Sequence, residues 1–320
     1  MSRIYELRLI TRVAQLYHGD GMKQAEISAL LHISQATISR LLKRAEQEGI
    51  VRITITPPRG TFPDLEAGLR ERFALTEAIV AECYEDREET ILGAIGDAAG
   101  HYFETTVSDG EVIGISSWSA SLLRMVDAIH PLKRARAERV VQILGGIGNP
   151  TVQSHATQLT TRLATLTSAE PMLLPAQGVA GSAAARLVMV GDGYVRGTMN
   201  QFRRVTMALI GIGALQPSVM LANSGNTFDS EELHDLEARG AVGDVCLRFF
   251  DEKGEAVGGP LDERVIGMTI DELRAVPRVV GVAGGERKVR AIRAALLGRL
   301  VDVLITDKFT AEKLLAQPAP

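Results

Sequence analysis

From Asp64 onwards the chain alternates short apolar runs with longer amphipathic runs. Apolar runs of this length, without polar alternation, indicate strands buried on both faces, and the runs between them have helical spacing. The predicted strands are 78–81, 112–115, 140–144, 279–283 and 301–305, and the predicted helices are 65–73, 88–103, 120–129 and 286–297. This alternation predicts an open α/β sheet with a largely parallel centre.

A proline-rich run, PPRGTFP at residues 57–63, interrupts every periodicity and marks a domain boundary. We therefore expect a head at residues 1–56 and a body at residues 57–320. Residues 1–60 hold nine Lys and Arg against five Asp and Glu, a net charge of +4, and the remainder holds 26 against 34, or −8. A basic head on an acidic body is typical of a DNA-binding protein with a separate sensing domain.

Within the head, residues 22–49 have the pattern of a helix-turn-helix. A helix at 24–31 is followed by a three-residue turn at 32–34 and a second helix, for which Ser34 is a good N-cap and Gly49 a good C-cap. His32 occupies a turn position that favours a left-handed residue, which His tolerates better than most. The second helix carries one apolar stripe, formed by Ile38, Leu41, Leu42 and Ala45. A first helix at 4–17 would brace the other two.

The opposite face of the second helix is small, polar and basic, which suits the DNA major groove. Arg40 could bind a guanine, whereas Lys43 and Arg44 would meet phosphates. The run IVRITI alternates like a short strand and predicts a wing that presents Arg52. The candidate DNA-binding residues are Gln35, Ala36, Thr37, Ser39, Arg40, Lys43, Arg44 and Arg52. The alternatives are a helical hairpin with a solvated basic face and a merely solvated Arg52.

Two strand-to-helix junctions in the body have the chemistry of an anion site. Residues 116–121, SSWSAS, offer hydroxyls and backbone N–H groups at a helix start, and residues 283–288, AGGERK, offer glycines and Lys288. Each could equally be a tight turn with surface polar residues. A third junction, GGIG at 145–148, lacks the spacing of a dinucleotide-binding loop.

Several classes of function are disfavoured. Cys83 and Cys246 are the only cysteines and the six histidines are scattered, so we expect a reducing cytoplasm and no metal site. The N-terminus has no signal-peptide pattern, and residues 205–222 are better interpreted as a buried strand followed by a loop than as a membrane span.

No nucleophile elbow follows residue 114, because Trp118 replaces the second glycine. No catalytic set and no cofactor are expected; Asp307 more plausibly caps a helix than transfers protons.

Five segments carry a family resemblance: SQATISRLLKRAEQEGIVRI, GISSWSASL, VVQILGGIG, GAVGDVCLRFFD, and the run from VVGVAGGERK to ITDKFTAEKLL. Together they resemble the SorC family of bacterial transcriptional regulators over most of the chain. The resemblance implies a winged helix-turn-helix joined to a Rossmann-like sugar-binding domain related to ribose-5-phosphate isomerase and glucosamine-6-phosphate deaminase. It also implies repressors or activators of carbohydrate operons that bind double-stranded operator DNA, usually as tetramers, under control of a sugar or sugar phosphate.

By the same resemblance, the effector site would use the loop at 116–121, Arg248 in CLRFFD, the AGGERK loop and Asp307. The candidate effector-binding residues are Ser116, Ser117, Trp118, Ser119, Ser121, Arg248, Gly284, Gly285, Lys288 and Asp307. Many members have a Gly-Thr pair in the first loop, where this chain has Ser119-Ala120 followed by Ser121. A Gly is also frequent at the position of Leu247. We expect a homo-oligomer, a dimer or tetramer; the rival hypotheses are a sugar-phosphate enzyme with a DNA-binding head and a constitutive architectural DNA binder.

Overall fold

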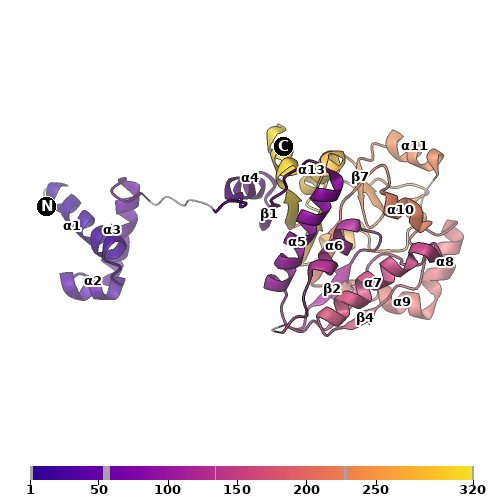
Figure 1. The fold of residues 1–320 in the computed structure, drawn as a ribbon, viewed down its shortest axis with the longest axis horizontal. Helices are drawn as coiled ribbons and strands as arrows, with labels where there is room; N and C mark the ends of the chain where they lie inside the picture. Colours follow the sequence, from indigo (N-terminus) through magenta and orange to yellow (C-terminus); the bar gives the residue numbers. More distant parts are fainter. Residues whose placement is uncertain (1–2, 53–57, 134, 227–228, 319–320) are drawn as a thin grey trace. The chain divides into compact units, whose positions relative to one another are not determined.

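The computed structural model describes residues 3–52, 58–133, 135–226 and 229–318, without the side chains of residues 150–155. The chain divides into two compact units, Met1–Pro58 and Arg59–Pro320 (Figure 1), which are described separately below. Among the described residues, no helix is both long and apolar enough to cross a membrane.

The first unit is a three-helix domain. Its helices are α1 (Arg3–Ala14), which continues into a π-helical turn (Gln15–Gly19), α2 (Gln24–Leu31) and α3 (Gln35–Gln47). All three predicted helices are confirmed, and their apolar stripes meet in a small core that includes Val13, Ile27, Ile38 and Leu42. Of the predicted wing, residues 53–55 lie outside the described part of the chain.

The turn between α2 and α3 follows from its residues. His32 adopts the left-handed conformation, with a φ of 55°, as the sequence predicted. The Ser28 hydroxyl donates to the Ile33 carbonyl oxygen at 2.6 Å and so closes the turn. Ser34 caps α3 by accepting the Thr37 N–H at 3.2 Å, and Gly49 leaves the helix with a φ of 70°. These contacts set the angle at which α3 is presented.

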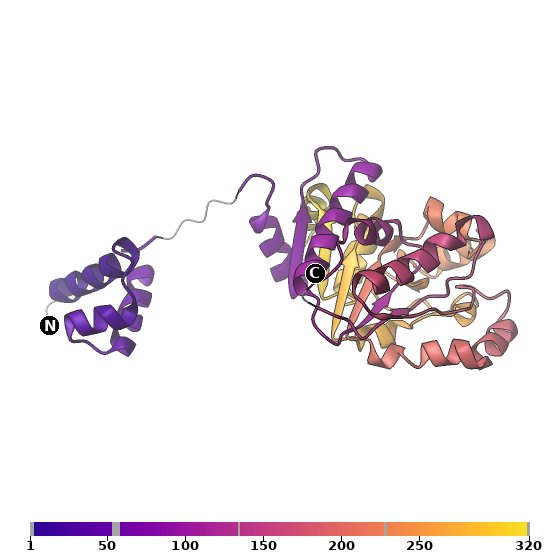
Figure 2. The same ribbon diagram turned by 60° about the horizontal axis from the view of Figure 1, so that its bottom comes forward.

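The second unit is built on a seven-stranded parallel sheet of order β1-β10-β9-β5-β2-β3-β4. Its strands are β1 (Glu77–Ala81), β2 (Val112–Ile115), β3 (Arg139–Gln142), β4 (Glu170–Met172), β5 (Met207–Gly211), β9 (Arg278–Val282) and β10 (Val303–Asp307). Figure 2 shows β10, from the end of the chain, lying beside β1. The predicted parallel α/β sheet is confirmed.

Successive strand residues pack on opposite faces of this sheet, as the uninterrupted apolar runs require. In β10, for example, Val303 and Ile305 join one core and Leu304 the other. Helices α5 (Glu88–Thr106), α6 (Ala120–Ala128) and α7 (Pro150–Leu166) cover the first face, with α6 between its neighbours in Figure 1. The second face packs against α4 (Pro63–Phe73), α13 (Val289–Leu297) and α14 (Lys308–Ala316), among others.

The remaining elements lie mainly between β4 and β9 in the chain. Helices α8 and α9 follow β4, and a three-stranded antiparallel sheet β6-β7-β8 follows β5. The predicted loop after β5 is therefore wrong in part, because residues 212–222 include β6 and most of α10. The bounds are α8 (Ala183–Gly191), α9 (Gly193–Met199), η2 (Phe202–Arg204), β6 (Gly213–Ala214), α10 (Val219–Ser224), α11 (Ser230–Ala238), β7 (Gly243–Val245), β8 (Arg248–Phe250), η3 (Asp262–Arg264), α12 (Ile270–Arg274) and η4 (Glu286–Lys288).

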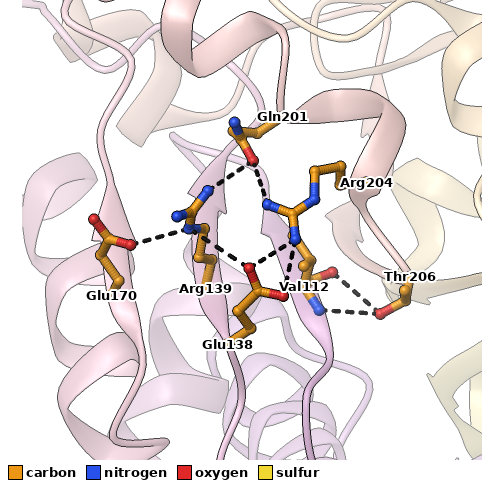
Figure 3. A network of polar contacts seen from close by, with 7 residues as sticks. All are labelled: Val112, Glu138, Arg139, Glu170, Gln201, Arg204 and Thr206. Atoms are coloured by element: carbon orange, nitrogen blue, oxygen red, sulfur yellow. Dashed lines mark hydrogen bonds and ion pairs between the residues drawn. The ribbon is translucent and has the colours of Figure 1, made fainter.

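A polar network joins the amino ends of the strands (Figure 3). Arg139, the first residue of β3, donates to Glu170 at the start of β4 and to Gln201, both at 3.0 Å. Arg204 in η2 donates to Glu138 at 2.7 Å and 2.9 Å. In the same region, the Thr206 hydroxyl bonds to the backbone N–H and carbonyl oxygen of Val112, at the start of β2. The amino edge of the sheet therefore carries structural ion pairs. In open parallel sheets, ligands bind at the opposite, carboxyl edge.

Candidate functional site

Helix α3 separates a buried face from an exposed one. Ile38, Leu42 and Ala45 are buried, whereas Thr37 and Arg44 are half-buried. The other residues predicted to meet DNA are exposed: Gln35, Ala36, Ser39, Arg40, Lys43 and Arg52. The first unit thus presents small, polar and basic side chains on one side of its most amphipathic helix.

Arg40 is connected to the capped start of α3. Its Nη2 donates to Thr37 Oγ1 at 3.2 Å, and that hydroxyl lies 2.8 Å from Ser34 Oγ. The chain of contacts orients the guanidinium toward the helix N-terminus, the end that reads bases in helix-turn-helix proteins.

Arg44 has a structural role. Its guanidinium forms ion pairs with Glu6 on α1 and with Glu48, the latter at 2.6 Å. The hydrogen bond with Glu6 raises the pKa of Arg44 above its ordinary value. The residue therefore joins α1 to α3, and a phosphate contact would compete with two carboxylates. Lys43 is the exposed cation beside it.

In the second unit a pocket opens at the carboxyl ends of β2 and β5, the position where open parallel sheets bind ligands. The space inside it, including its mouth, is about 680 Å³. Most of its lining comes from four segments: the serine loop (Ser116–Ala120), the segment after β5, the β7–β8 hairpin and the η4 turn. The lining residues are Glu88, Leu92, Ser116, Ser117, Trp118, Ser119, Ala120, Leu144, Gly211, Ile212, Gly213, Ala214, Gln216, Pro217, Ser218, Leu221, Asp244, Cys246, Leu247, Arg287 and Lys288.

The serine loop is held in place by hydrogen bonds to neighbouring strands. Ser117 donates to the Leu144 carbonyl oxygen at 2.9 Å and accepts from Gln142 at 2.9 Å. Trp118 Nε1 donates to the Gly145 carbonyl oxygen at 3.0 Å. Ser119 caps α6, so this loop delivers its hydroxyls beside a helix N-terminus.

Asp244 and Lys288 bring opposite charges to the same pocket. Burial raises the pKa of Asp244 to about 6, although its carboxylate accepts the Leu247 N–H at 3.0 Å. Burial likewise lowers the pKa of Lys288, with a further contribution from Arg287. The attraction between the two charges opposes the effect of burial on both groups: it lowers the pKa of Asp244 and raises the pKa of Lys288. A ligand with hydroxyls and one anionic group would supply partners for both.

Three residues of the pocket other than glycine are in the left-handed region. Cys246 and Leu247, with φ values of 52° and 59°, form the two-residue turn between β7 and β8, and Trp118 has a φ of 60°. Hairpin turns of this shape favour Asn-Gly or Gly-Gly, so residues with a Cβ strain the backbone here. Strain of this kind concentrates at binding sites, where the fold holds a side chain in one position.

Of the ten residues predicted for an effector, five line this pocket: Ser116, Ser117, Trp118, Ser119 and Lys288. The other five support it. Ser121 donates to the Val282 carbonyl oxygen at 2.7 Å. Arg248 points to the loop after β8, where it pairs with Asp262 at 2.8 Å and donates to the Val265 and Gly267 carbonyl oxygens.

Asp307 and the two glycines position η4. Asp307 caps α14 by accepting the Thr310 N–H at 3.0 Å, the role that the sequence favoured. Its second oxygen accepts the Gly285 N–H at 3.1 Å. A Cβ on Gly284 would come within 2.3 Å of that oxygen, and Gly285 has a φ of 96°. Both positions therefore require glycine.

The pocket also contains charged residues that sequence reasoning missed, chiefly Asp244, Glu88 and Arg287. Asp244 had one local signal, since it is a lone charge within the apolar run AVGDVCL. The described residues include no group of three or more His, Cys, Asp or Glu side chains that could hold a metal ion.

Comparisons with known proteins agree with this architecture. The family model described as "Putative sugar-binding domain" matches residues 60–316, and the MarR family model matches residues 13–60. The deoxyribonucleoside regulator of Bacillus subtilis is 31% identical over 96% of this chain and 97% of its own length. The sorbitol operon regulator of Klebsiella pneumoniae is 33% identical over 98% of this chain and 100% of its own length.

Solved structures show the same arrangement. The crystal structure of the full-length sorbitol operon regulator SorC from Klebsiella pneumoniae superposes with a TM-score of 0.74 at 32% identity, covering 97% of this chain and 98% of that one. The sugar-binding domain of a transcriptional regulator from Pseudomonas syringae pv. tomato is 41% identical, with a TM-score of 0.63, over 80% of this chain and 100% of its own. These relatives are transcriptional regulators, not enzymes. The chain belongs to the SorC family of sugar-binding transcriptional regulators, with a helix-turn-helix head and an open parallel α/β domain.

Proposed function

We propose that this chain regulates a carbohydrate or polyol catabolic operon from the cytoplasm, and that a small sugar or sugar phosphate sets its affinity for operator DNA. The observation that carries the proposal is the composition of the pocket, where Asp244 and Lys288 line the same space as several serine side chains. The carboxylate suits sugar hydroxyls, and the ammonium suits a phosphate or another anionic group. The relatives named for sorbitol and deoxyribonucleosides support this class of ligand.

The first test is a ligand screen. We would follow the fluorescence of Trp118, the single tryptophan, against free pentoses, hexoses, polyols and their phosphates. Because Trp118 lines the pocket, binding there should change its emission and raise the melting temperature. A ligand at 100 times its dissociation constant adds about 2.7 kcal/mol to the free energy of unfolding. If no compound in the panel changed either signal, the proposed effector class would be wrong.

DNA binding by the first unit is proposed to use the exposed face of α3. Arg40 is assigned to a base, with Gln35, Ala36, Thr37 and Ser39 close to it, and Lys43 to phosphate. Arg52, beside the predicted wing, is assigned to the DNA backbone. The target duplex can be obtained by selecting bound molecules from a random-sequence library.

Arg40→Ala should weaken binding to that selected duplex by about 1 to 3 kcal/mol, because it removes a bidentate base contact. Binding to unrelated DNA should fall much less, since one charge of several is lost. Arg12→Ala, which removes an exposed cation from α1, is the matched control. Equal losses for the two variants, measured by fluorescence anisotropy with intact melting curves, would mean that α3 does not read bases.

Self-association is proposed to use helix α8. Its sequence, AAARLVMVG, contains one charged residue, yet none of its side chains is buried. Leu187 and Val188 are 65% and 77% exposed, and Tyr194 on α9 is 83% exposed. Exposed large apolar side chains on neighbouring helices are typical of an interface, and a symmetric contact would bury the same side chains on two copies.

Val188→Glu should therefore shift the protein toward smaller species. Two copies of the acid would meet in a symmetric interface, where burying unpaired charge costs several kcal/mol, so the association constant should fall about tenfold or more. Val188→Thr keeps the volume without the charge and should change association less. Sedimentation velocity at micromolar concentration measures both; an unchanged sedimentation coefficient for Val188→Glu would exclude α8 from the interface.

A further inference from the structure

Helix α14 contacts the start of the η4 turn through its first residues. Asp307, its N-cap, and Thr310 in its first turn both accept the Gly285 N–H, at 3.1 Å and 2.7 Å. Gly285 directly precedes η4, whose last residue is Lys288. The start of α14 thus fixes the base of the turn that brings the ammonium into the pocket.

The middle of α14 contacts the same turn a second time. Lys313 forms ion pairs with Glu286 of η4 and, at 2.8 Å, with Asp86, which precedes α5. Arg287 of η4 lies 3.7 Å from Glu88, the first residue of α5. Two of these ion pairs hold η4, one against α14 and one against α5, and the third joins α14 to the segment before α5. Because each is partly solvated, they can exchange partners at little cost.

The far end of α14 is held by α4, the first helix after the proline-rich run. Arg72 of α4 donates to three carbonyl oxygens at the C-terminus of α14, those of Leu314, Leu315 and Gln317, at 3.2, 2.6 and 2.8 Å. Gly68 lets the two helices approach, since a Cβ there would lie 3.1 Å from a Leu315 methyl group. Figure 1 shows α4 beside the C-terminal end of the chain.

From these contacts we propose that α14 couples the occupancy of the pocket to α4, and so to the segment that leads to the DNA-binding head, with Lys313 as the positioning residue. The inference rests on the proposed function. A ligand that binds Lys288 is expected to shift η4, because the ion pairs that hold this turn are partly solvated. The displacement either moves α14 through Lys313 or breaks the Lys313–Glu286 pair. Both alter the constraint on α14, which Arg72 joins to α4.

Lys313→Met in the full-length chain tests the coupling. It should change the affinity for the selected duplex, without any ligand, by about 2- to 30-fold, the range for substitutions along a coupled network. D-glucitol 6-phosphate serves as the probe for the liganded state. Its effect on DNA affinity should shrink in the variant, while its binding, followed by Trp118 fluorescence, stays within about twofold, since Lys313 does not line the pocket.

Arg162→Met is the matched control, because it removes an exposed ion pair, with Asp127, from helices α7 and α6 on the other face of the sheet. It should leave DNA affinity and the response to the probe unchanged. The proposal is overturned if Lys313→Met resembles Arg162→Met in both measurements. If no sugar or phosphate binds the wild type, the proposed effector class fails, but the ligand-free comparison of the two variants still decides the role of α14.

Discussion

Lys288→Met should reduce the affinity for an anionic sugar effector by about 100-fold, because removing one partner of a buried charge pair costs about 2 to 5 kcal/mol. Lys288 is a partly buried cation of η4 that lines the pocket, and methionine has a similar length but no charge. DNA affinity without effector should stay close to that of the wild type, since the ion pairs that hold η4 are made by Glu286 and Arg287. Titration of Trp118 fluorescence measures the first quantity and anisotropy the second.

Arg287→Met is the matched comparison for that experiment. Arg287 belongs to the same turn and also lines the pocket, but it is 44% exposed and pairs with Glu88 at the mouth. Its loss should cost about 1 kcal/mol or less, as for other solvated pairs. Should both variants bind the effector as tightly as the wild type, η4 would have no part in the site. If a free polyol bound tightly and Lys288→Met did not weaken its binding, the proposal that the effector carries a phosphate would be wrong.

The fold was predictable because its signals are local. Strand β2 was predicted residue by residue at 112–115, and α2 at 24–31, since apolar periodicity and turn residues define such elements within a few positions. The prediction for β10 was displaced by two residues: the predicted range was 301–305, and the strand is Val303–Asp307. Boundaries of buried strands are harder to place, because an apolar run continues into the loop on either side.

The candidate site was only half predictable, because it depends on contacts between distant segments. Two loops at strand ends were visible in the sequence, but Asp244 comes from a small antiparallel sheet that no local periodicity announced. Arg248 shows the opposite difficulty. The family resemblance indicated that Arg248 binds the ligand, whereas its guanidinium is occupied by Asp262 and by backbone carbonyl oxygens. Only the three-dimensional arrangement distinguishes a residue that supports a pocket from one that lines it.

Asp244→Asn should make the protein more stable at neutral pH. The pKa of Asp244 in the folded protein, about 6, lies above its ordinary value of 3.8, so the folded state binds this proton more tightly than the unfolded state. Ionisation of Asp244 therefore lowers the free energy of unfolding. The loss is absent below about pH 4 and reaches about 3 kcal/mol above about pH 6 to 7. Asparagine removes this penalty and keeps an oxygen for the Leu247 N–H, although its amide group needs a partner of its own.

The prediction is tested by urea unfolding of wild type and variant at pH 4.5 and pH 7.5, followed by Trp118 fluorescence, which reports on the second unit alone. The other carboxylates cancel in the difference between the two proteins, so the stabilisation by Asp244→Asn should be about 2 kcal/mol larger at the higher pH than at the lower one. An equal difference at both pH values would mean that Asp244 titrates normally. A gain in stability together with a loss of effector affinity would show why the carboxylate is kept: its buried charge is unfavourable in the empty pocket and is compensated by the ligand.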